Sequence, residues 1–283
     1  MPQTKVALFG AAGKIGTRIA EKMRDDDDYH MLFVETGDAG LARLRDRGLT
    51  PASQRDAVNE AEIIVFAIPD TLIGKVTGEI VPQLQSGAMV ILLDPAAPHS
   101  SELPQREDIA YFVTHPCHPP LINAEETPEA RADFWGGTAK QNIVCALMQG
   151  PETAYAQGER LARCMFAPVM NAHRITVEQM AILEPTMAET MILTCQVIIK
   201  EAIEEAIRRG VPREVAYDFA MGHMRVNIGI LFDYIDAQLS DGAKLAVKRA
   251  KEYIFQPEWE KVFEPENVLA EVRAIVEGRG SIK

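Results

Sequence analysis

Two histidines three positions apart are the clearest candidates for acid–base chemistry in the sequence. His115 and His118 belong to the stretch HPCHPP, whose prolines limit how far the two imidazoles can move. Either ring could accept a proton from a substrate hydroxyl or ligate a metal ion. The His-x-x-His spacing alone is weak evidence for zinc, because cysteines and further ligands are missing. The stretch therefore predicts a site and leaves proton transfer, metal binding and an incidental surface pair all open.

A glycine-rich turn, GAAGKIG over residues 10–16, follows an apolar run and precedes a helical apolar pattern. Glycine allows the backbone to turn sharply there, and it lets a pyrophosphate approach the N–H groups at the helix N-terminus. The spacing G-x-x-G-x-x-G is a variant of the commoner G-x-G-x-x-G. The pattern predicts a dinucleotide site. The turn residues expected at the cofactor are Gly10, Ala12, Gly13, Lys14 and Ile15.

The acid that accompanies such a turn lies at the end of the next apolar run. Glu35 comes 19 residues after Gly16, where a carboxylate accepts hydrogen bonds from the adenosine ribose hydroxyls. A carboxylate there repels the additional phosphate of NADP, and the next residues, 36–38, offer no cation to receive it. We therefore expect NAD as the cofactor. The alternative is a glycine turn that serves only packing, with Glu35 an ordinary surface acid.

A parallel sheet is the element that would position these residues. Short apolar runs occupy residues 6–9, 31–34, 63–68, 89–93, 110–113 and 142–148. Runs that are apolar on both faces suit a parallel sheet covered by helices on each side. Ligands of doubly wound folds bind at the carboxyl ends of the strands. We therefore expect Pro69 and Asp70, which follow the third run, at the cofactor, and both histidines close by.

Beyond Val169 the pattern changes to long helices. The longest is predicted over 177–209 and ends at Gly210, with a proline two residues later. Residues 191–199 are apolar nearly all round the helix, which favours burial in the core of a homodimer. The fold class we predict is α/β: an N-terminal Rossmann domain with a doubly wound parallel sheet, followed by an all-helical C-terminal domain. We place the NAD-binding domain at 1–170 and the helical substrate and dimerisation domain at 171–283.

The overall charge argues against two classes of partner. The 283 residues include 29 Lys and Arg and 41 Asp and Glu, for a formal net charge of −12. This charge repels phosphate backbones and anionic lipid surfaces, so we expect neither nucleic acid nor a membrane as partner. The four cysteines are far apart and the N-terminal residues do not form a signal peptide. We therefore expect free thiols and a cytoplasmic protein.

The order of these features resembles the β-hydroxyacid dehydrogenase superfamily, which includes 6-phosphogluconate dehydrogenase. That order is a Rossmann domain, Pro69 after a strand, His115-Pro116, and then a helical domain. Four segments are similar to a narrower family, the D-apionate oxidoisomerases, and together they extend over nearly the whole chain. They are HPCHPP, GGTAKQNIVCALMQGPE, HRITVEQMAILEP and the late Gly222-His223. The first and third are the most specific.

One departure from the superfamily directs attention to Glu184. Dehydrogenases of the superfamily carry a catalytic lysine eleven residues after a histidine-like strand end, and eleven residues after His173 stands Glu184. A glutamate cannot supply the positive charge of a lysine. Beside His115, its carboxylate could instead hold a divalent metal that polarises the substrate oxygens. The alternative is an acid at a helix start before Pro185.

Four more residues remain open as site candidates. Lys140 could pair with a substrate carboxylate or be an exposed lysine. Glu178 and Glu189 are further acids of the same helix, and His223 fits a core histidine better than a ligand.

The resemblance implies an NAD-dependent oxidoreductase acting on a small hydroxy acid, branched and polyhydroxylated like D-apionate. It implies oxidation of a hydroxyl, followed by an α-ketol shift to 3-oxo-isoapionate. We expect His115, His118, Lys140 and Glu184 to act in catalysis, and His115 with Glu184 to hold any divalent metal. Two alternatives stay open: a simple 2- or 3-hydroxyacid dehydrogenase without rearrangement, and a non-catalytic NAD-binding sensor. The stiff histidine stretch argues against the sensor, which has no need of two imidazoles near the cofactor.

Overall fold

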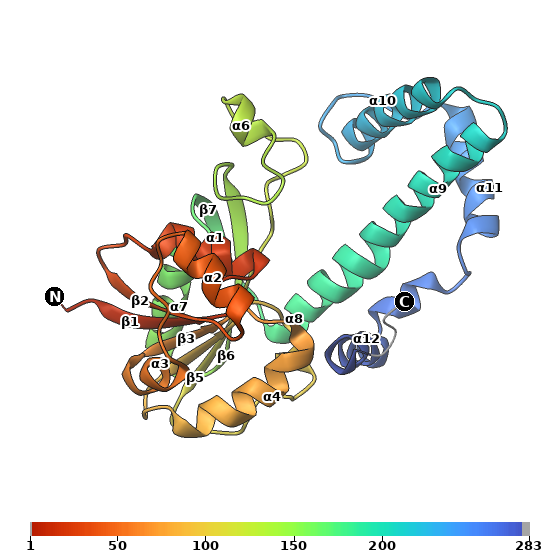
Figure 1. Cartoon of the computed structure of the whole chain (residues 1–283). Helices are drawn as coiled ribbons and strands as arrows, with labels where there is room; N and C mark the ends of the chain where they lie inside the picture. Colours follow the sequence, from red (N-terminus) through yellow and green to blue (C-terminus); the bar gives the residue numbers. More distant parts are fainter. Residues whose placement is uncertain (1, 279–283) are drawn as a thin grey trace. The chain divides into compact units, whose positions relative to one another are not determined.

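Every apolar run predicted as a strand lies in one sheet, and one further strand extends it (Figure 1). The structure is a computed structural model and describes residues 2–278. The strands are β1 (Thr4–Phe9), β2 (Tyr29–Val34), β3 (Ile63–Phe66), β4 (Met89–Leu92), β5 (Ala110–Pro116), β6 (Gln141–Gln149) and β7 (Val169–Arg174). Their order in space is β2-β1-β3-β4-β5-β6-β7. Since β2 and β3 lie on opposite sides of β1, the carboxyl ends of β1 and β3 form the crevice in which doubly wound folds bind ligands.

The sheet is parallel from β2 to β5, as expected, and changes direction at β6. Strand β6 runs antiparallel to β5, with Pro116 opposite Ile143, and β7 is parallel to β6. A hydrophobic pattern reports which side chains are buried and does not report strand direction, so the sequence could not reveal this reversal. Strand β7 was not predicted because its side chains are half-buried or exposed, and His173 and Arg174 interrupt its apolar character.

Two hydrophobic clusters cover the two faces of the sheet. In β1, Ala7 and Phe9 belong to one cluster, whereas Val6 and Leu8 belong to the other. This alternation arises because successive side chains of a strand point to opposite faces. Helices α1 (Lys14–Met23) and α7 (Glu152–Met165) pack on the face of Leu8. Helices on both faces confirm the prediction drawn from the doubly apolar runs.

The remaining helices follow the chain order of Figure 1. They are α2 (Asp38–Asp46), α3 (Gln54–Glu60), α4 (Asp70–Ile80), α5 (Ala96–His99), α6 (Pro128–Arg131), α8 (Val177–Ala181), α9 (Thr194–Arg208), α10 (Arg213–Leu231), α11 (Asp241–Ile254) and α12 (Pro265–Glu277). Helices α3, α4, α5, α8 and α12 contribute to the cluster that contains Phe9.

The chain divides into two compact units whose bounds differ from the predicted domains. The first unit contains the residues up to Pro185 and those from Val268 onward, and the second is Thr186–Asn267. The predicted boundary after residue 170 falls inside β7, which the first unit retains because β7 pairs with β6. Helix α12 also returns to the first unit, where its buried valines join the core of the sheet. Beyond β7 the regular elements are helical over the described residues, as predicted.

The long predicted helix is continuous, but its winding changes along its length. Helix α8 leads into π-helical turns over Ile182–Leu193, which lead into α9. Pro185 lies inside these turns and has no N–H to donate. Widened π turns are rare and often occur at functional sites. Glu184 therefore stands in an unusual helical segment directly before a proline.

The C-terminal end of α9 agrees with its predicted stop. Gly210 has a φ of +99°, a left-handed conformation that glycine adopts without strain. The N–H of Gly210 donates to the carbonyl of Ile207 at 2.9 Å, and that of Val211 to the carbonyl of Ala206 at 3.1 Å. These two bonds form the Schellman arrangement that satisfies the last carbonyls of a helix.

The second unit leaves many of its large apolar side chains exposed. Among them are Leu193, Val197, Phe219, Phe232 and Tyr253. The described residues also contain one helical stretch, Val177–Arg208, that length and composition alone would allow to span a membrane. Its first turns are nevertheless part of the first unit's core, where Val177, Met180 and Ala181 are buried.

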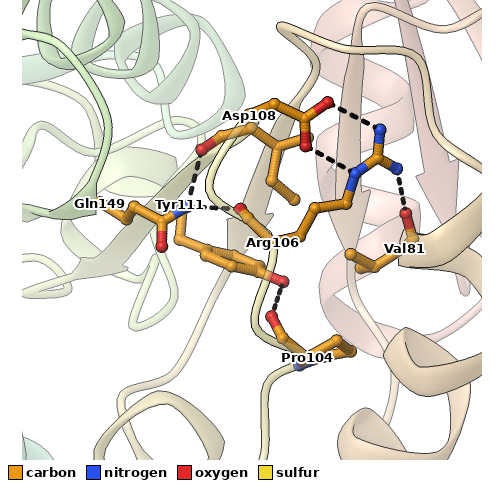
Figure 2. A network of polar contacts seen from close by, with 7 residues as sticks. Val81, Pro104, Arg106, Asp108, Tyr111 and Gln149 are labelled. Atoms are coloured by element: carbon orange, nitrogen blue, oxygen red, sulfur yellow. Dashed lines mark hydrogen bonds and ion pairs between the residues drawn. The ribbon is translucent and has the colours of Figure 1, made fainter.

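A polar network joins the segment before β5 to the rest of the sheet (Figure 2). Arg106 donates to both carboxylate oxygens of Asp108, at 2.8 and 3.0 Å, and to the carbonyl of Val81 at 2.6 Å. The hydroxyl of Tyr111 donates to the carbonyl of Pro104 at 2.6 Å. Gln149 donates to the carbonyls of Arg106 and Ile109. The amino end of β5 is thus held by charge-paired and fully hydrogen-bonded groups.

Candidate functional site

The glycine turn has the geometry that its sequence predicts. Gly10 has a φ of +77°, and a Cβ at this position would overlap the carbonyl of Ala67. A Cβ at Gly16 would overlap the carbonyl of Gly10, so these two positions require glycine. The N–H of Gly13 closes the turn by donating to the carbonyl of Gly10 at 2.9 Å.

The turn delivers the N-terminus of α1 to the crevice without a side-chain cap. Gly13 is the N-cap residue, and within the described chain no side chain caps α1. The N–H groups of the first turn, which begins at Lys14 and Ile15, are therefore available to an anion, and the helix dipole favours negative charge there. This arrangement suits the pyrophosphate of a dinucleotide.

Glu35 lies at the carboxyl end of β2 and contacts the same turn. Its Oε2 accepts the N–H of Ala12 at 2.8 Å, and its Oε1 accepts the N–H of Thr36 at 3.1 Å. Arg43 of α2 reaches the other side of the same residue, with its Nε donating to the carbonyl of Ala12 at 3.3 Å. The sequence analysis considered only residues 36–38 as a source of cations and missed Arg43. An acid and a base therefore flank Ala12.

A cavity of about 360 Å³ opens between the turn and the carboxyl ends of the neighbouring strands. It is lined by Gly13, Lys14, Ile15, Phe66, Ala67, Ile68, Pro69, Asp70, Ile73, Leu92, Leu93, Asp94, Ala97, Pro98 and His115. The lining includes the predicted cofactor residues Pro69 and Asp70 together with His115. The turn, two carboxylates and one imidazole therefore share a single cavity.

His115 is oriented by a backbone carbonyl. It stands near the end of β5, and its Nδ1 lies 2.7 Å from the carbonyl oxygen of Leu93. Because a carbonyl only accepts hydrogen bonds, Nδ1 carries the proton. The other ring nitrogen, Nε2, faces Glu184, with 3.4 Å between Nε2 and Oε2. The structure thus brings together the two residues predicted to hold a metal.

Asp94 completes a set of three metal-compatible ligands. It follows β4, and its Oδ1 accepts the N–H of Ala96 at 2.7 Å. One ligand atom each from Asp94, His115 and Glu184 lies within 4.8 Å of the other two. Two carboxylates and one imidazole are a donor set suited to a divalent cation, and the Leu93 carbonyl supplies the outer hydrogen bond that ligating histidines commonly make.

The carboxylates near this set carry unfavourable negative charge. Burial, followed by repulsion from Asp70, raises the pKa of Asp94 to about 7. Burial is also the main cause that raises the pKa of Asp70, and the charge of Glu184 adds to it. One imidazole cannot neutralise three carboxylates, whereas a divalent cation would remove most of the repulsion. The electrostatics therefore fit a bound cation.

His118 lies beside this cluster in a strained conformation. Its φ is +60°, which is uncommon for a residue other than glycine, and its ring meets the ring of His115 edge-on at 6.1 Å between centroids. Its Nδ1 lies 3.2 Å from the carbonyl oxygen of Trp135. Partial burial lowers the pKa of His118, although the bond to Trp135 opposes this shift.

The other predicted site residues lie elsewhere. Lys140 is not among the residues that line the cavity in the described chain, and its backbone N–H donates to Glu125. Glu178 lies in the first turn of α8, where its own N–H and the Thr176 hydroxyl lower the pKa of its carboxyl. Glu189 belongs to the second unit. His223, predicted to be a core residue, is exposed on α10 with its ring stacked on Phe219.

Sequence reasoning missed Asp94 as a site residue. The signal was present, because Asp94 closes a predicted strand of the parallel sheet in the same way as Asp70 follows another. The carboxyl ends of adjacent parallel strands meet at one edge, so both acids could have been placed there. What the sequence does not show is that their side chains converge on His115.

Two family models together cover nearly the whole chain. Residues 1–122 match the NADPH-binding domain of acetohydroxy acid isomeroreductase, and residues 123–276 match the C-terminal domain of phosphogluconate dehydrogenase (decarboxylating).

Relatives that resemble the chain over its full length are more specific. D-apionate oxidoisomerase from Rhizobium rhizogenes is 45% identical over 96% of this chain and 99% of its own. D-apionate oxidoisomerase from Cupriavidus necator is 44% identical with the same coverage. A crystal structure of a semialdehyde dehydrogenase NAD-binding protein from Cupriavidus necator, in complex with calcium and NAD, is 43% identical. It superimposes with a TM-score of 0.94 over 97% of this chain and 100% of that one.

Proposed function

The chain belongs to the D-apionate oxidoisomerase family, and we propose that it oxidises D-apionate or a similar branched hydroxy acid with NAD and isomerises the product. The observation that carries the proposal is the shared cavity, which joins a dinucleotide turn to an acid cluster around His115. In the first step, the hydroxyl beside the carboxylate loses its proton to a base and its carbon loses a hydride. The product of this step is a 2-oxo acid with a tertiary alcohol next to the carbonyl.

The second step is an α-ketol shift. The tertiary hydroxyl loses a proton and becomes a carbonyl, while a hydroxymethyl group moves to the adjacent carbon. The former carbonyl oxygen gains a proton, so the step conserves atoms and needs no further oxidant. When bound, NAD accepts the hydride and a divalent cation polarises the two substrate oxygens.

The residues of the chain divide these tasks. The glycine turn and the N-terminus of α1 bind the pyrophosphate, and Glu35 binds the adenosine ribose in place of the Ala12 N–H. Asp94, His115 and Glu184 would hold the divalent cation. His118 is the group left to transfer the proton of the substrate hydroxyl. Lys140 receives no role here, because the structure does not bring it to the cavity.

A product analysis tests the proposal and separates it from simple oxidation. The purified protein is mixed with D-apionate, NAD and a magnesium or calcium salt, and NADH formation is followed by absorbance. Carbon NMR of the product is needed because rearrangement conserves mass. We expect the rearranged 3-oxo acid. An unrearranged 2-oxo acid would indicate a plain hydroxyacid dehydrogenase, and no turnover of any branched acid would favour an NAD-binding sensor.

We also propose that the protein works as a homodimer in the cytoplasm. The second unit exposes large apolar side chains, such as Leu193 and Phe232, that a second copy would cover. A membrane is a poor alternative occupant, since the long apolar helix begins in the core of the first unit and carries Glu184 at the acid cluster. Light scattering at micromolar concentration, without detergent, tests this, and a monomer would contradict it.

A further inference from the structure

The strained backbone of His118 raises the question of what holds its imidazole in place. A left-handed conformation in a residue other than glycine persists only where the surrounding structure determines it, and such residues gather at functional sites. The only hydrogen bond described for the His118 ring runs from Nδ1 to the carbonyl oxygen of Trp135, at 3.2 Å. The rings of these two residues also meet edge-on, with centroids 5.6 Å apart.

The loop that carries this carbonyl is built around one carboxylate. Asp133 accepts four backbone N–H groups at 3.0 Å each, those of Trp135, Gly136, Thr138 and Ala139. Burial opposes its ionisation, but these four donors hold the pKa of Asp133 below its usual value. Gly136 and Gly137 have φ values of +88° and +115°, which the loop needs in order to reverse. The loop 133–139 is therefore a preorganised unit.

Helix α1 holds this loop with two cations. The Arg18 guanidinium donates through Nη2 to the carbonyl of Trp135 and lies over the Trp135 ring, with 5.6 Å from Cζ to the centroid. One turn further along the helix, Lys22 donates through Nζ to the carbonyl of Gly137 at 2.6 Å. The same helix presents its N-terminus to the dinucleotide site. The carbonyl of Trp135 thus accepts from Arg18 on one side and from His118 on the other.

We infer that Arg18 is a positioning residue that acts through the Trp135 carbonyl to fix the orientation and tautomer of His118. Because Nδ1 must donate to this carbonyl, the neutral ring carries its proton on Nδ1 and leaves Nε2 as an acceptor. An imidazole fixed in this way can take the proton of a substrate hydroxyl through Nε2. This role for His118 rests on the proposed function, whereas the fixed tautomer does not.

The same device operates twice in the site with different results. His115 also binds a carbonyl through Nδ1, but its Nε2 faces Glu184 and, with Asp94, forms the cation-compatible set. In the described part of the chain, His118 does not join that set. One imidazole is thus placed for a metal and its neighbour for a proton.

Three variants of α1 test the inference by steady-state kinetics. Arg18→Met removes the donor to Trp135, and Arg18→Lys restores a charge and one donor. Lys22→Met is the matched control, since it removes a bond from the same helix to the same loop without touching Trp135. We expect Arg18→Met to lower kcat by roughly ten- to a hundredfold, because misplacing a catalytic group by about 1 Å has effects of this size. The KM for NAD should change little, the lysine variant should recover part of the rate, and Lys22→Met should stay within about twofold of the parent.

Nitrogen NMR of histidine-labelled protein provides a readout that needs no turnover. The parent should show His118, assigned with a His118→Asn variant, as the Nδ1–H tautomer. Arg18→Met should shift this signal toward the Nε2–H form, whereas Lys22→Met should not. If Arg18→Met does not fold, Arg18→Gln replaces it, since the amide keeps the polarity and loses the charge.

The inference is overturned if His118 is Nε2–H in the parent, or if its tautomer and kcat respond to Lys22→Met as strongly as to the Arg18 variants. A failure of the D-apionate assay with the expected NMR result would remove the proposed function and leave the positioning by Arg18 intact.

Discussion

The two ends of strand β5 use polar residues in opposite ways. At its amino end, Arg106 pairs with Asp108, and the hydroxyl of Tyr111 meets a carbonyl, so each polar group has a complementary partner. At its carboxyl end, Asp94 and Glu184 gather around the single imidazole of His115. The same strand therefore separates a region built for stability from one built to bind and react.

The ionisation of the acids shows this difference directly. Beside Arg106, the pKa of Asp108 is lowered, so its charge supports the folded state. Burial and the neighbouring Asp70 raise the pKa of Asp94 to about 7, so its charge opposes the folded state. Proteins retain such unfavourable groups where a ligand or a reaction uses them. Substitutions at the two ends should accordingly affect different measurements.

The largest effect should come from Glu184→Gln, which keeps the size of the side chain and removes its charge. If Glu184 holds the cation at the substrate oxygens, losing one such electrostatic stabiliser should raise the barrier by about 3 kcal/mol and slow turnover about a hundredfold. The melting temperature and NAD binding should stay near those of the parent. Initial rates with and without added magnesium or calcium measure the effect.

Glu178→Gln is the control for this variant, because Glu178 lies in the first turn of α8 at a distance of six residues along the chain. It should retain activity within about twofold, since a solvent-accessible carboxyl at a helix N-terminus contributes a few tenths of a kcal/mol to stability. A Glu184→Gln enzyme within a few-fold of the parent, or full parent activity after exhaustive chelation, would remove the metal role.

Asp94→Asn should change how stability depends on pH and on cations. A carboxyl whose folded pKa is raised from 3.8 to about 7 contributes stability below pH 4 that is lost as the pH rises through 7. Without added metal, the asparagine variant should therefore gain in melting temperature relative to the parent between about pH 5 and about pH 8. Calorimetry at both pH values measures this difference.

Added calcium or magnesium should reverse the order at the higher pH. At a concentration about 100 times the dissociation constant, a bound ion stabilises the parent by about 2.7 kcal/mol, and the variant should respond much less. An equal response of parent and variant would show that Asp94 is not a ligand.

Glu35→Ala should relax the choice of dinucleotide at another carboxyl end of the sheet, that of β2. Removing the carboxylate ends its repulsion of the NADP phosphate and leaves Arg43, which contacts Ala12, as a nearby cation. We expect the ratio of kcat/KM for NAD over NADP to fall by roughly tenfold, or about 1.4 kcal/mol. Asp38→Ala, a change of an exposed acid three residues away, should leave that ratio unchanged. A parent enzyme that uses both cofactors equally would contradict the role of Glu35.

The smallest effect should come from Tyr111→Phe at the amino end of β5. The variant loses one buried hydrogen bond, to the carbonyl of Pro104, and should lose about 1 kcal/mol of unfolding free energy. Its kcat should not change, because the hydroxyl is remote from the cavity residues. Urea denaturation and initial rates measure the two quantities. A clear loss of kcat without loss of stability would show that the two ends of the strand are coupled.

Much of this architecture is encoded in short stretches of the chain. The turn at residues 10–16 needs glycine for local steric reasons, the strands follow from continuous apolar runs, and Gly210 ends its helix through its own left-handed backbone. Glu35 could be found because the distance from turn to acid is set within one strand–helix–strand unit. Features of this kind depend on neighbours in sequence, and a sequence displays those neighbours.

Only the tertiary structure decided which distant residues meet. It joined Asp94 to His115 and Glu184, left Lys140 away from the cavity, and placed Arg18 and Trp135 behind His118. It also set the antiparallel direction of β6 and returned α12 to the first unit. These outcomes depend on how strands pair and how a loop of defined shape packs on a helix. Residues far apart in the chain contribute to each of them, so no local pattern records the result.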